Sequence, residues 1–318
     1  MFETRENTMG VLSRKLLGAV AGTVMAMSVA GTATADVPES DRAIIIPLHN
    51  WTGATIGGAI AGQILQDMGY NVEFVAVGAL AAAQAIADGD VTFTPELWDN
   101  NLGELYPTLM AEGKIVDLGE VGIDAREGWL YPIHVEELCP GLPDWEAFLG
   151  CSEIFATPET FPNGRYLDYP AEWLSRGGDM VRNEGLPFDV VPAGSEGALV
   201  AELNSSVDRQ SALIMMFWAP HWVLFKHDYN WVEMPTDLVE KYSMQKPRVF
   251  KAGWPGMFDE WPVASNFIQS FQIDNAAQEV LMDEIDNKGV PLMEATRAWI
   301  DANPDKWQPF VDEAMAGS

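Results

Sequence analysis

The stretch Ser211–Asp228, SALIMMFWAPHWVLFKHD, contains the feature that decides the fold. Its apolar run from 212 to 217 is short and bounded, which is typical of a strand buried on both faces of a sheet. The run breaks at Ala219-Pro220, and proline is favoured in the first turn of a helix. We therefore predict that Trp218 lies where a buried parallel strand passes into a helix. Ligands of open α/β sheets bind at this edge, outside the carboxyl ends of the strands.

Two other tryptophans follow predicted strands in the same way. Trp51 comes after an apolar strand at Ala43–Pro47, and Trp98 comes after a strand at Val91–Leu97. Helices are expected between these strands, among them a short alanine-rich helix that Gly89 would end. Strands that alternate with helices favour parallel pairing and right-handed crossovers, so the predicted fold class is α/β.

The alternation changes near Gly128, which divides the chain into two predicted domains. An apolar strand at 128–135 marks the crossing into a second domain, and the chain returns near Leu224. The first lobe would comprise residues 36–127 and 224–318, and the second lobe residues 128–223. Within the second lobe, residues 157–169 (TPETFPNGRYLDY) are interpreted as a loop between regular elements.

Residues 1–35 have the layout of a cleaved secretory signal peptide. Arg14 and Lys15 precede an apolar stretch at Leu16–Ala30, and small residues follow up to Asp36. The apolar stretch is short and rich in alanine and glycine, which argues against a membrane span. We expect a mature protein that begins at Asp36 and is exported to the periplasm.

The charge of the chain excludes two classes of partner. The 318 residues carry a formal net charge of −29, and removal of the predicted signal peptide leaves 15 basic and 45 acidic residues. Such a field repels nucleic acids and anionic membrane surfaces. The simplest interpretation is a solvated acidic surface suited to a salty environment.

The two cysteines, Cys139 and Cys151, are predicted to form a disulfide because the exported protein would fold in an oxidising compartment. The alternative is a pair of free buried thiols. The sequence has no CxxC redox motif, so neither interpretation gives these residues a catalytic role.

Tryptophans that line one cleft from two lobes could surround a cationic ligand. Trp51, Trp98 and Trp218 are the main candidates, with Trp129 near the domain crossing as a fourth wall and Tyr131 as the alternative to it. Indole is the best aromatic partner for a cation, and each ring contributes roughly 0.5 to 2 kcal/mol. A box of several rings suits a methylated ammonium, which has no N–H to donate. The alternative is that these tryptophans belong to the core, as most tryptophans do.

The sequence lacks the motifs of common enzyme classes. Its four histidines come without an HExxH motif or a nucleophile elbow, and there is no P-loop and no GxGxxG fingerprint. We therefore predict no catalytic residue and no required cofactor.

One loop allows a structural calcium site. Glu159, Asn163 and Asp168 supply hard oxygen ligands around the sharp turn Pro162-Asn163-Gly164. The spacing is not that of an EF-hand, and a plain exposed turn is the alternative.

Two segments resemble the periplasmic solute-binding proteins of ABC importers for glycine betaine, choline and related methylated amines. One is Ala85-Ile86-Ala87-Asp88-Gly89-Asp90-Val91 running into Glu96-Leu97-Trp98. The other is Trp218-Ala219-Pro220-His221-Trp222 followed by Phe225-Lys226-His227-Asp228. The resemblance covers about residues 44 to 304, most of the mature chain.

The resemblance implies a type II periplasmic binding protein fold. Each of two lobes would be a mainly parallel sheet flanked by helices, and two hinge crossings would join them. It also implies an aromatic box that holds the methylated nitrogen, to which Trp51, Trp98 and Trp218 match by position, with Trp129 about where the wall from the second lobe is expected. An ABC permease and ATPase subunits at the inner membrane are the implied protein partners, and we expect the binding protein itself to be a monomer.

Departures from the family pattern narrow the expected ligand. Choline binders of this family tend to carry an aspartate two residues after the first box tryptophan, where this chain has Gly53. A carboxylate ligand would be repelled by Glu153 in the second lobe unless that residue were protonated. Trimethylamine N-oxide needs only one donor for its oxygen, which a desolvated, protonated Glu153 could provide. Members that bind trimethylamine N-oxide are therefore the ones that the chain is expected to resemble most.

Other functions stay open from the sequence alone. The same box could hold glycine betaine, choline or dimethylsulfoniopropionate. A different class would be a secreted enzyme that processes such amines, and a third would be a structural or adhesive exported protein with tryptophans only in its core.

Overall fold

A computed structural model describes residues 37–244 and 246–317 of the chain. The predicted signal peptide, residues 1–35, lies outside the described residues. Within the described part, none of the helices combines the length and the apolar composition needed to cross a membrane.

The first lobe is built from five strands in two short sheets. The strands are β1 (Ile44–Leu48), β2 (Val72–Ala76), β3 (Phe93–Trp98), β4 (Val116–Glu120) and β10 (Val249–Gly253). β1 pairs with β2 in parallel, and β10 lies between β3 and β4, antiparallel to both. The amide of Thr92 donates to the carbonyl of Ile45 at 2.9 Å, which links the two sheets. The sheets are thus more mixed than the predicted parallel arrangement, because β10 returns from the second lobe in the opposite direction.

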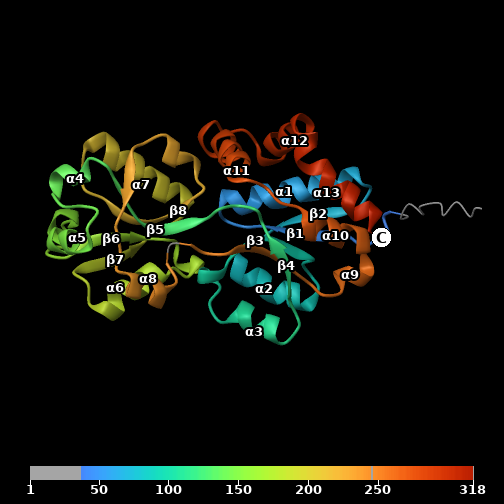
Figure 1. Cartoon of the computed structure of the whole chain (residues 1–318), viewed down its shortest axis with the longest axis horizontal. Helices are drawn as coiled ribbons and strands as arrows, with labels where there is room; N and C mark the ends of the chain where they lie inside the picture. The colour runs from blue at the N-terminus through green and yellow to red at the C-terminus, as the bar shows by residue number, and fades with distance from the viewer. Residues whose placement is uncertain (1–36, 245, 318) are drawn as a thin grey trace, which may run out of the picture. The chain divides into compact units, whose positions relative to one another are not determined.

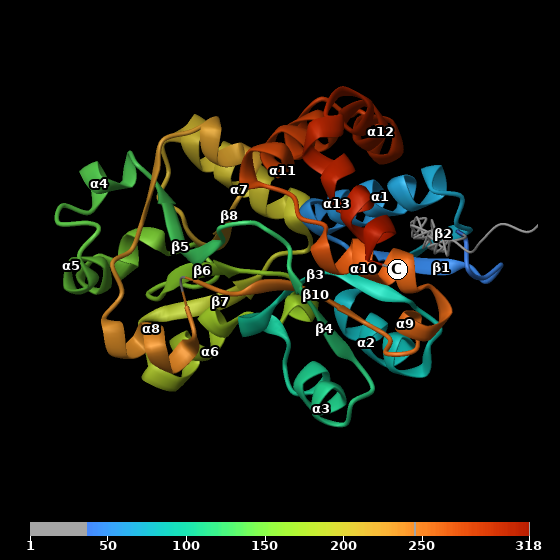
Figure 2. The same cartoon turned by 45° about the vertical axis from the view of Figure 1, so that its right-hand side comes forward.

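Helices cover both sides of these strands (Figures 1 and 2). They are α1 (Thr52–Asp67), α2 (Ala79–Asp88), α3 (Leu105–Ala111), α9 (Met257–Glu260), α10 (Pro262–Ser270), α11 (Asn275–Met282), α12 (Leu292–Ala302) and α13 (Pro304–Ala316), with a 3-10 turn η1 (Asp99–Asn101) and a π-helical turn η5 (Asp283–Asn287). Helix α1 is apolar or small on all sides and is buried almost throughout, as such a helix must be. Helix α2 ends at Gly89, whose φ of 78° is the left-handed conformation that the sequence predicted for this stop.

The second lobe contains one sheet of five strands in the order β7-β6-β8-β5-β9. The strands are β5 (Arg126–Pro132), β6 (Gly164–Asp168), β7 (Phe188–Pro192), β8 (Ile214–Ala219) and β9 (Tyr229–Trp231). β6 pairs in parallel with β7 and β8, whereas β5 runs antiparallel to both β8 and β9. β8 occupies the middle of this sheet and is buried almost completely, as its apolar run predicted.

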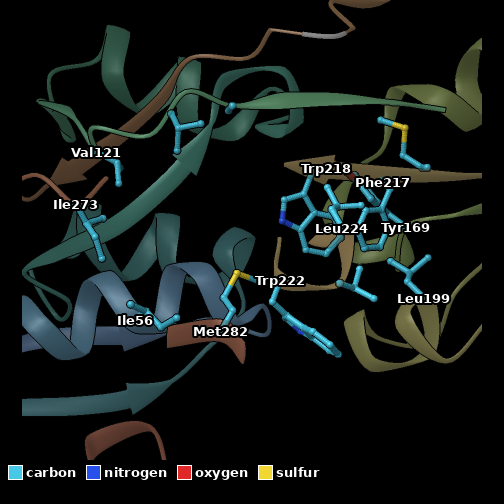
Figure 3. Packing of buried hydrophobic residues seen from close by; sticks show 14 of the residues in the cluster. Ile56, Val121, Tyr169, Leu199, Phe217, Trp218, Trp222, Leu224, Ile273 and Met282 are labelled. Carbon is cyan, nitrogen blue, oxygen red and sulfur yellow. The ribbon is translucent and has the colours of Figure 1, made fainter. Parts of the chain in front are cut away.

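Short helices surround this sheet, with α7 on one face and α6 and α8 on the other (Figure 1). The helices are α4 (Val135–Leu138), α5 (Trp145–Gly150), α6 (Arg176–Glu184), α7 (Glu196–Arg209) and α8 (Thr236–Tyr242), with 3-10 turns η2 (Ser152–Phe155), η3 (Ala171–Trp173) and η4 (Trp222–Phe225). Cys139, after α4, and Cys151, after α5, are joined by a disulfide with a Cα–Cα distance of 5.8 Å. Figure 3 shows Phe217, Trp218 and Tyr169 packed together in the core of this lobe.

Two local predictions were wrong. Pro220 does not begin a helix: the Ala219–Pro220 peptide is cis, and only the short turn η4 follows, capped by the His221 side chain. Residues 157–169 are not all loop, because β6 lies within them and is a central strand of the sheet. The charged Arg165 and Asp168 at its ends had obscured the strand pattern.

The chain returns to the first lobe later than the sequence indicated. The predicted return was near Leu224, but β9 pairs with β5 in the second sheet. Helix α8 follows β9, and Tyr242 at its end donates a hydrogen bond of 2.6 Å to Glu184 at the end of α6. The second crossing therefore lies between α8 and β10, where strand pairing with the first lobe resumes at Val249.

Candidate functional site

A cavity of about 250 Å³ lies between the two lobes and is mostly apolar. Both lobes contribute to its walls. Its lining residues are Asn50, Trp51, Gly78, Ala79, Leu80, Ala81, Leu97, Trp98, Asn101, Leu102, Tyr106, Glu127, Tyr169, Glu172, Trp173 and Trp218. Small-molecule sites have this character, with aromatic walls and a few polar groups that fix the ligand's orientation.

Four tryptophans line this cavity, two from each lobe. Trp51 follows β1 and Trp98 ends β3, whereas Trp173 ends the turn η3 and Trp218 lies near the end of β8. The Trp173 ring meets the edge of Trp51 at 5.9 Å and of Trp218 at 5.6 Å between ring centroids. Tyr169 lies edge-on to Trp218 at 5.5 Å. Aromatic rings from both lobes thus line one cavity, as an aromatic box would require.

The two rings of the first lobe are fixed from behind. Trp51 stacks on His49 at 4.9 Å with 11° between the ring planes. His49 is buried, which lowers its pKa to about 4 and keeps the ring neutral at physiological pH. The indole N–H groups of Trp51 and Trp98 both donate to Oε1 of Glu96, at 2.7 and 2.9 Å. One face of Trp51 is therefore occupied by protein, while the residue lines the cavity with the remainder of its surface.

A buried carboxyl group, Glu127, forms the polar wall of the cavity. It stands opposite Trp218 in the β5–β8 register, so the two side chains share a face of the sheet. Asn101 donates to its Oε1 at 2.9 Å and Asn100 donates to its Oε2. Glu127 is 1% exposed, and this burial raises the pKa of its carboxyl group, although the two amide donors and the Tyr169 hydroxyl act in the opposite direction.

Tyr169 adds a hydroxyl beside Glu127. The side chain is buried, and its pKa is raised well above the usual value by burial and by the neighbouring Glu127 carboxylate. Its hydroxyl lies near enough to Glu127 to lower the pKa of that carboxyl group, but no partner among residues 37–244 and 246–317 has full hydrogen-bond geometry. A buried hydroxyl without a partner is costly, and a ligand oxygen in the cavity could supply the missing bond.

Residues that line the cavity form a hydrogen-bonded cluster that joins the lobes, and Asn50 and Glu172 in it are exposed. Asn50, on the first lobe, accepts from Nε1 of Trp173 at 2.9 Å and donates to Glu172 at 2.9 Å, both on the second lobe. Asn50 thus holds Trp173 in the box, and it can do so only when the lobes are together.

The structure brings Trp51, Trp98 and Trp218 to one cavity but leaves Trp129 and Tyr131 away from it. Trp129 is 0% exposed and packs on Tyr166 at 4.6 Å inside the second lobe. β5 enters the cavity wall at Glu127, so Trp129, two residues further on, lies about 7 Å deeper in the lobe. Tyr131 is also fully buried, and its hydroxyl donates to Glu136 at 3.1 Å. The fourth ring is Trp173 instead.

Glu153 is likewise not part of the cavity. It lies in the turn η2 and is exposed to solvent, so the desolvated donor expected from the sequence is not at this position. The acidic residue with that environment is Glu127. The predicted strand began at Gly128, one residue too late to include Glu127. Trp218, which lies opposite Glu127 on β8, is among the predicted site residues.

The predicted calcium ligands are not gathered at one place. Glu159 is exposed, and Asn163 donates to Asp189 at 3.0 Å. Asp168 lies at the opposite end of β6, about 16 Å away along a five-residue strand. Its carboxylate is buried and accepts from the amide of Tyr169 at 2.9 Å. In the described part of the chain, no group of three or more His, Cys, Asp or Glu residues could hold a metal ion.

Residues 42–302 match the family described as the substrate-binding domain of ABC-type glycine betaine transport systems. The chain belongs to this family. The family is the one that the two sequence segments resemble, a family of substrate-binding domains of ABC transporters.

Relatives and solved structures agree with this assignment. A trimethylamine N-oxide-binding protein from Pelagibacter ubique is 33% identical over 208 residues, which cover 62% of this chain and 65% of the relative, slightly less than two thirds of its length. The structure of a glycine betaine, L-proline-binding protein of an ABC transporter from Borrelia burgdorferi has a TM-score of 0.74 at 20% identity, over 87% of this chain and 99% of that one. An ABC-transporter choline-binding protein in complex with choline has a TM-score of 0.75 at 17% identity, over 87% and 93% of the two chains. These structures confirm the type II periplasmic binding protein fold.

Proposed function

We propose that this protein captures trimethylamine N-oxide in the cavity between its lobes and delivers it to the permease of an ABC importer. The observation that carries the proposal is the box of four tryptophans, two from each lobe, with the buried Glu127 on its polar wall. The relative from Pelagibacter ubique, whose name states that it binds trimethylamine N-oxide, supports the same ligand.

The trimethylammonium end of the ligand fits the aromatic box. It has no N–H, so its cationic nitrogen is recognised through the faces of aromatic rings, each worth roughly 0.5 to 2 kcal/mol. Trp173 and Trp218 reach this centre from the second lobe, and Trp51 and Trp98 reach it from the first. The ligand therefore binds the closed protein more tightly than the open one and shifts the population towards closure.

The oxygen of the ligand fits the wall formed by Glu127 and Tyr169. A protonated Glu127 donates one hydrogen bond, and the Tyr169 hydroxyl, which has no partner with full hydrogen-bond geometry in residues 37–244 and 246–317, donates another. Burial raises the pKa of Glu127 and so favours the protonated form. Glycine betaine is disfavoured at the same place, because its carboxylate is larger than one oxygen and brings a negative charge into a cavity that Glu172 also lines.

The mechanism of transport follows from closure. The closed lobes present one rigid surface to the permease, and ATPase subunits in the cytoplasm supply the energy for transport. The binding protein acts in the periplasm as a monomer after removal of residues 1–35, and it supplies recognition without chemistry.

Choline is a second candidate, favoured by one specific observation. Asn100 and Asn101 both donate to Glu127, and hydrogen bonds of this kind stabilise a carboxylate. An ionised Glu127 would accept from the hydroxyl of choline and neutralise its net positive charge. A protonated Glu127 therefore favours trimethylamine N-oxide, and an ionised Glu127 favours choline.

Isothermal titration of the mature protein against trimethylamine N-oxide, choline, glycine betaine and dimethylsulfoniopropionate tests the proposal. Tightest binding of the N-oxide supports it, and tightest binding of any other of the four overturns the choice of ligand. If none of the four binds, the assignment of the cavity to methylated compounds is wrong.

A further inference from the structure

One carboxylate connects the two tryptophans of the first lobe. Oε1 of Glu96 accepts the indole N–H of Trp51 at 2.7 Å and that of Trp98 at 2.9 Å, and Oε2 accepts from Nε2 of Gln278 at 2.9 Å. Trp51 comes from the turn after β1 and Trp98 from the end of β3, so the shared acceptor ties two separate strands together at their carboxyl ends.

Glu96 is buried behind the box and does not line the cavity. It is 2% exposed, and the hydrogen-bond donors that reach it from the described residues are neutral. Burial raises the pKa of this carboxyl group, while its three hydrogen bonds favour the ionised form. Unlike Glu127, which faces the cavity and the Tyr169 hydroxyl, Glu96 has only N–H donors as side-chain hydrogen-bond partners among the described residues, and this set of partners fits the ionised form. Its negative charge then acts on its surroundings.

The charge lies at the N–H edges of two rings whose faces are available to a ligand. An indole that donates to a carboxylate is polarised, and its face becomes more negative. A cation over that face is attracted both by the ring quadrupole and by the anion behind it. Because Glu96 has its three donors in the ligand-free structure, this potential is present before the ligand arrives.

We propose that Glu96 is the positioning and affinity-determining residue of the box: its carboxylate fixes the mutual orientation of Trp51 and Trp98 and adds the negative potential that selects a cationic nitrogen. This inference rests on the proposed function, since it assumes that the box receives a methylated ammonium group. It goes further in assigning part of the selectivity to a residue that does not touch the ligand.

Two variants separate the two roles. Glu96→Gln keeps a side-chain oxygen that accepts both indole N–H groups, and its amide can donate to Gln278 after that side chain turns over, so it removes mainly the charge. Glu96→Ala removes the charge and the orientation together. Glu39→Gln is the matched control: Glu39 also accepts two hydrogen bonds from neutral donors of the first lobe, from Tyr70 at 2.6 Å and from the amide of Val263 at 2.6 Å, but it does not line the cavity.

The probes are trimethylamine N-oxide, tetramethylammonium and tert-butanol, in which a carbon atom replaces the nitrogen of the N-oxide. In Glu96→Gln the affinities for the N-oxide and for tetramethylammonium fall about fivefold or more relative to that for tert-butanol, as expected for the loss of an electrostatic contribution to two cation–π contacts. Glu39→Gln leaves these ratios unchanged. Glu96→Ala weakens all three ligands and changes the near-ultraviolet circular dichroism of the ligand-free protein, whereas Glu96→Gln preserves that spectrum.

Unchanged affinity ratios in Glu96→Gln overturn the electrostatic role. An unchanged near-ultraviolet spectrum in Glu96→Ala overturns the positioning role, and this measurement needs no ligand. If Glu96→Ala fails to fold, the comparison between Glu96→Gln and Glu39→Gln still decides the electrostatic role. Failure of the unaltered protein to bind any methylated probe counts against the proposed function itself, which distinguishes that failure from a failure of the inference about Glu96.

Discussion

The carboxylate of Glu196, on the second lobe, accepts a hydrogen bond of 2.8 Å from the main-chain amide of Thr52, the first residue of α1 on the first lobe. Within the described part of the chain, the N-terminus of α1 has no side-chain cap of its own, because its cap residue is Trp51. The amide groups of a first helical turn need acceptors, and a carboxylate there also interacts favourably with the helix dipole. One lobe thus caps a helix of the other. His221 donates to the same carboxylate at 3.2 Å from within the second lobe and fixes its position.

We predict that Glu196→Ala weakens ligand affinity although Glu196 does not line the cavity. Closure would no longer supply a cap for α1, which is worth about 1 kcal/mol, so the dissociation constant rises about fivefold. Glu202→Ala is a suitable control, because Glu202 lies on the same helix α7 but pairs with Arg165 inside the second lobe. Isothermal titration measures the affinities, and small-angle scattering at saturating ligand reports closure. Equal affinities for the two variants would show that this contact does not contribute to closure.

We predict that affinity for trimethylamine N-oxide falls as pH rises. Burial raises the pKa of Glu127, and the protonated form is the one proposed to donate to the ligand oxygen. Binding is therefore complete below this raised pKa and is lost as pH rises through it, by about tenfold for each further unit. Titrations are made over a pH range in which the ligand itself does not ionise.

Glu127→Gln provides the matched comparison for this pH dependence. Its amide keeps a donor and has no proton to lose, so its affinity should be nearly constant over the same range. Glu127→Ala should bind weakly at every pH. A wild-type affinity that rises with pH would instead favour an ionised Glu127 and a cationic ligand such as choline.

The sequence was sufficient to predict three of the tryptophans that line the cavity. β1 and β8 are apolar runs that stop abruptly, and β3 alternates with helices in the same way, so the positions of Trp51, Trp98 and Trp218 at strand ends followed from chain order. These three residues do line one cavity. The family and the α/β fold class could also be predicted from the sequence.

The remaining site residues were missed for a physical reason that they share. Trp173 follows β6, a central strand whose sequence, GRYLD, carries charged residues that find partners inside the lobe. Once β6 is recognised, Trp173 is another tryptophan a few residues beyond a strand end. Glu127 is a charged residue just before the apolar part of β5, and the predicted strand began at Gly128, after it. Register decides such cases, because only the pairing of β5 with β8 puts Glu127 opposite Trp218.

We predict that Trp173 contributes to affinity as strongly as the three tryptophans found from sequence. Trp173→Ala removes one face of the box and the cross-lobe bond to Asn50, so affinity should fall about 5- to 30-fold, equivalent to 1–2 kcal/mol. Trp173→Phe keeps a ring but loses the N–H and should be intermediate. Trp307→Phe is the matched control, since Trp307 is also partly buried and donates its N–H to a carbonyl, that of Ile300, at 2.9 Å. If Trp173→Ala bound the ligand with wild-type affinity, the Trp173 ring would not contribute to the box.

Gly53 of α1 packs against Gln278, the side chain that donates to Glu96. We therefore predict that alanine has different effects at Gly53 and at Gly57 of the same helix. A Cβ on Gly53 would lie 2.7 Å from Nε2 of Gln278, the atom that donates to Glu96. The flexible amide of Gln278 would move away, so Gly53→Ala should cost that hydrogen bond, about 0.5–1.5 kcal/mol, and lower the ligand affinity accordingly. At Gly57 the nearest atom would be Cβ of Pro95 at 3.9 Å, an ordinary contact. Gly57→Ala should therefore leave affinity unchanged and raise the melting temperature, because alanine is favoured over glycine inside a helix.

The cause of the Gly53 effect can be isolated by a double-variant cycle with Gln278→Ala. If Gly53→Ala acts by displacing Gln278, the double variant binds no more weakly than Gln278→Ala alone, since the same hydrogen bond cannot be lost twice. Titration calorimetry of the four proteins gives the coupling directly. Losses that simply add would mean that alanine at position 53 disturbs the site by another route, such as a shift of α1 against β3 that moves Trp51 relative to Trp98.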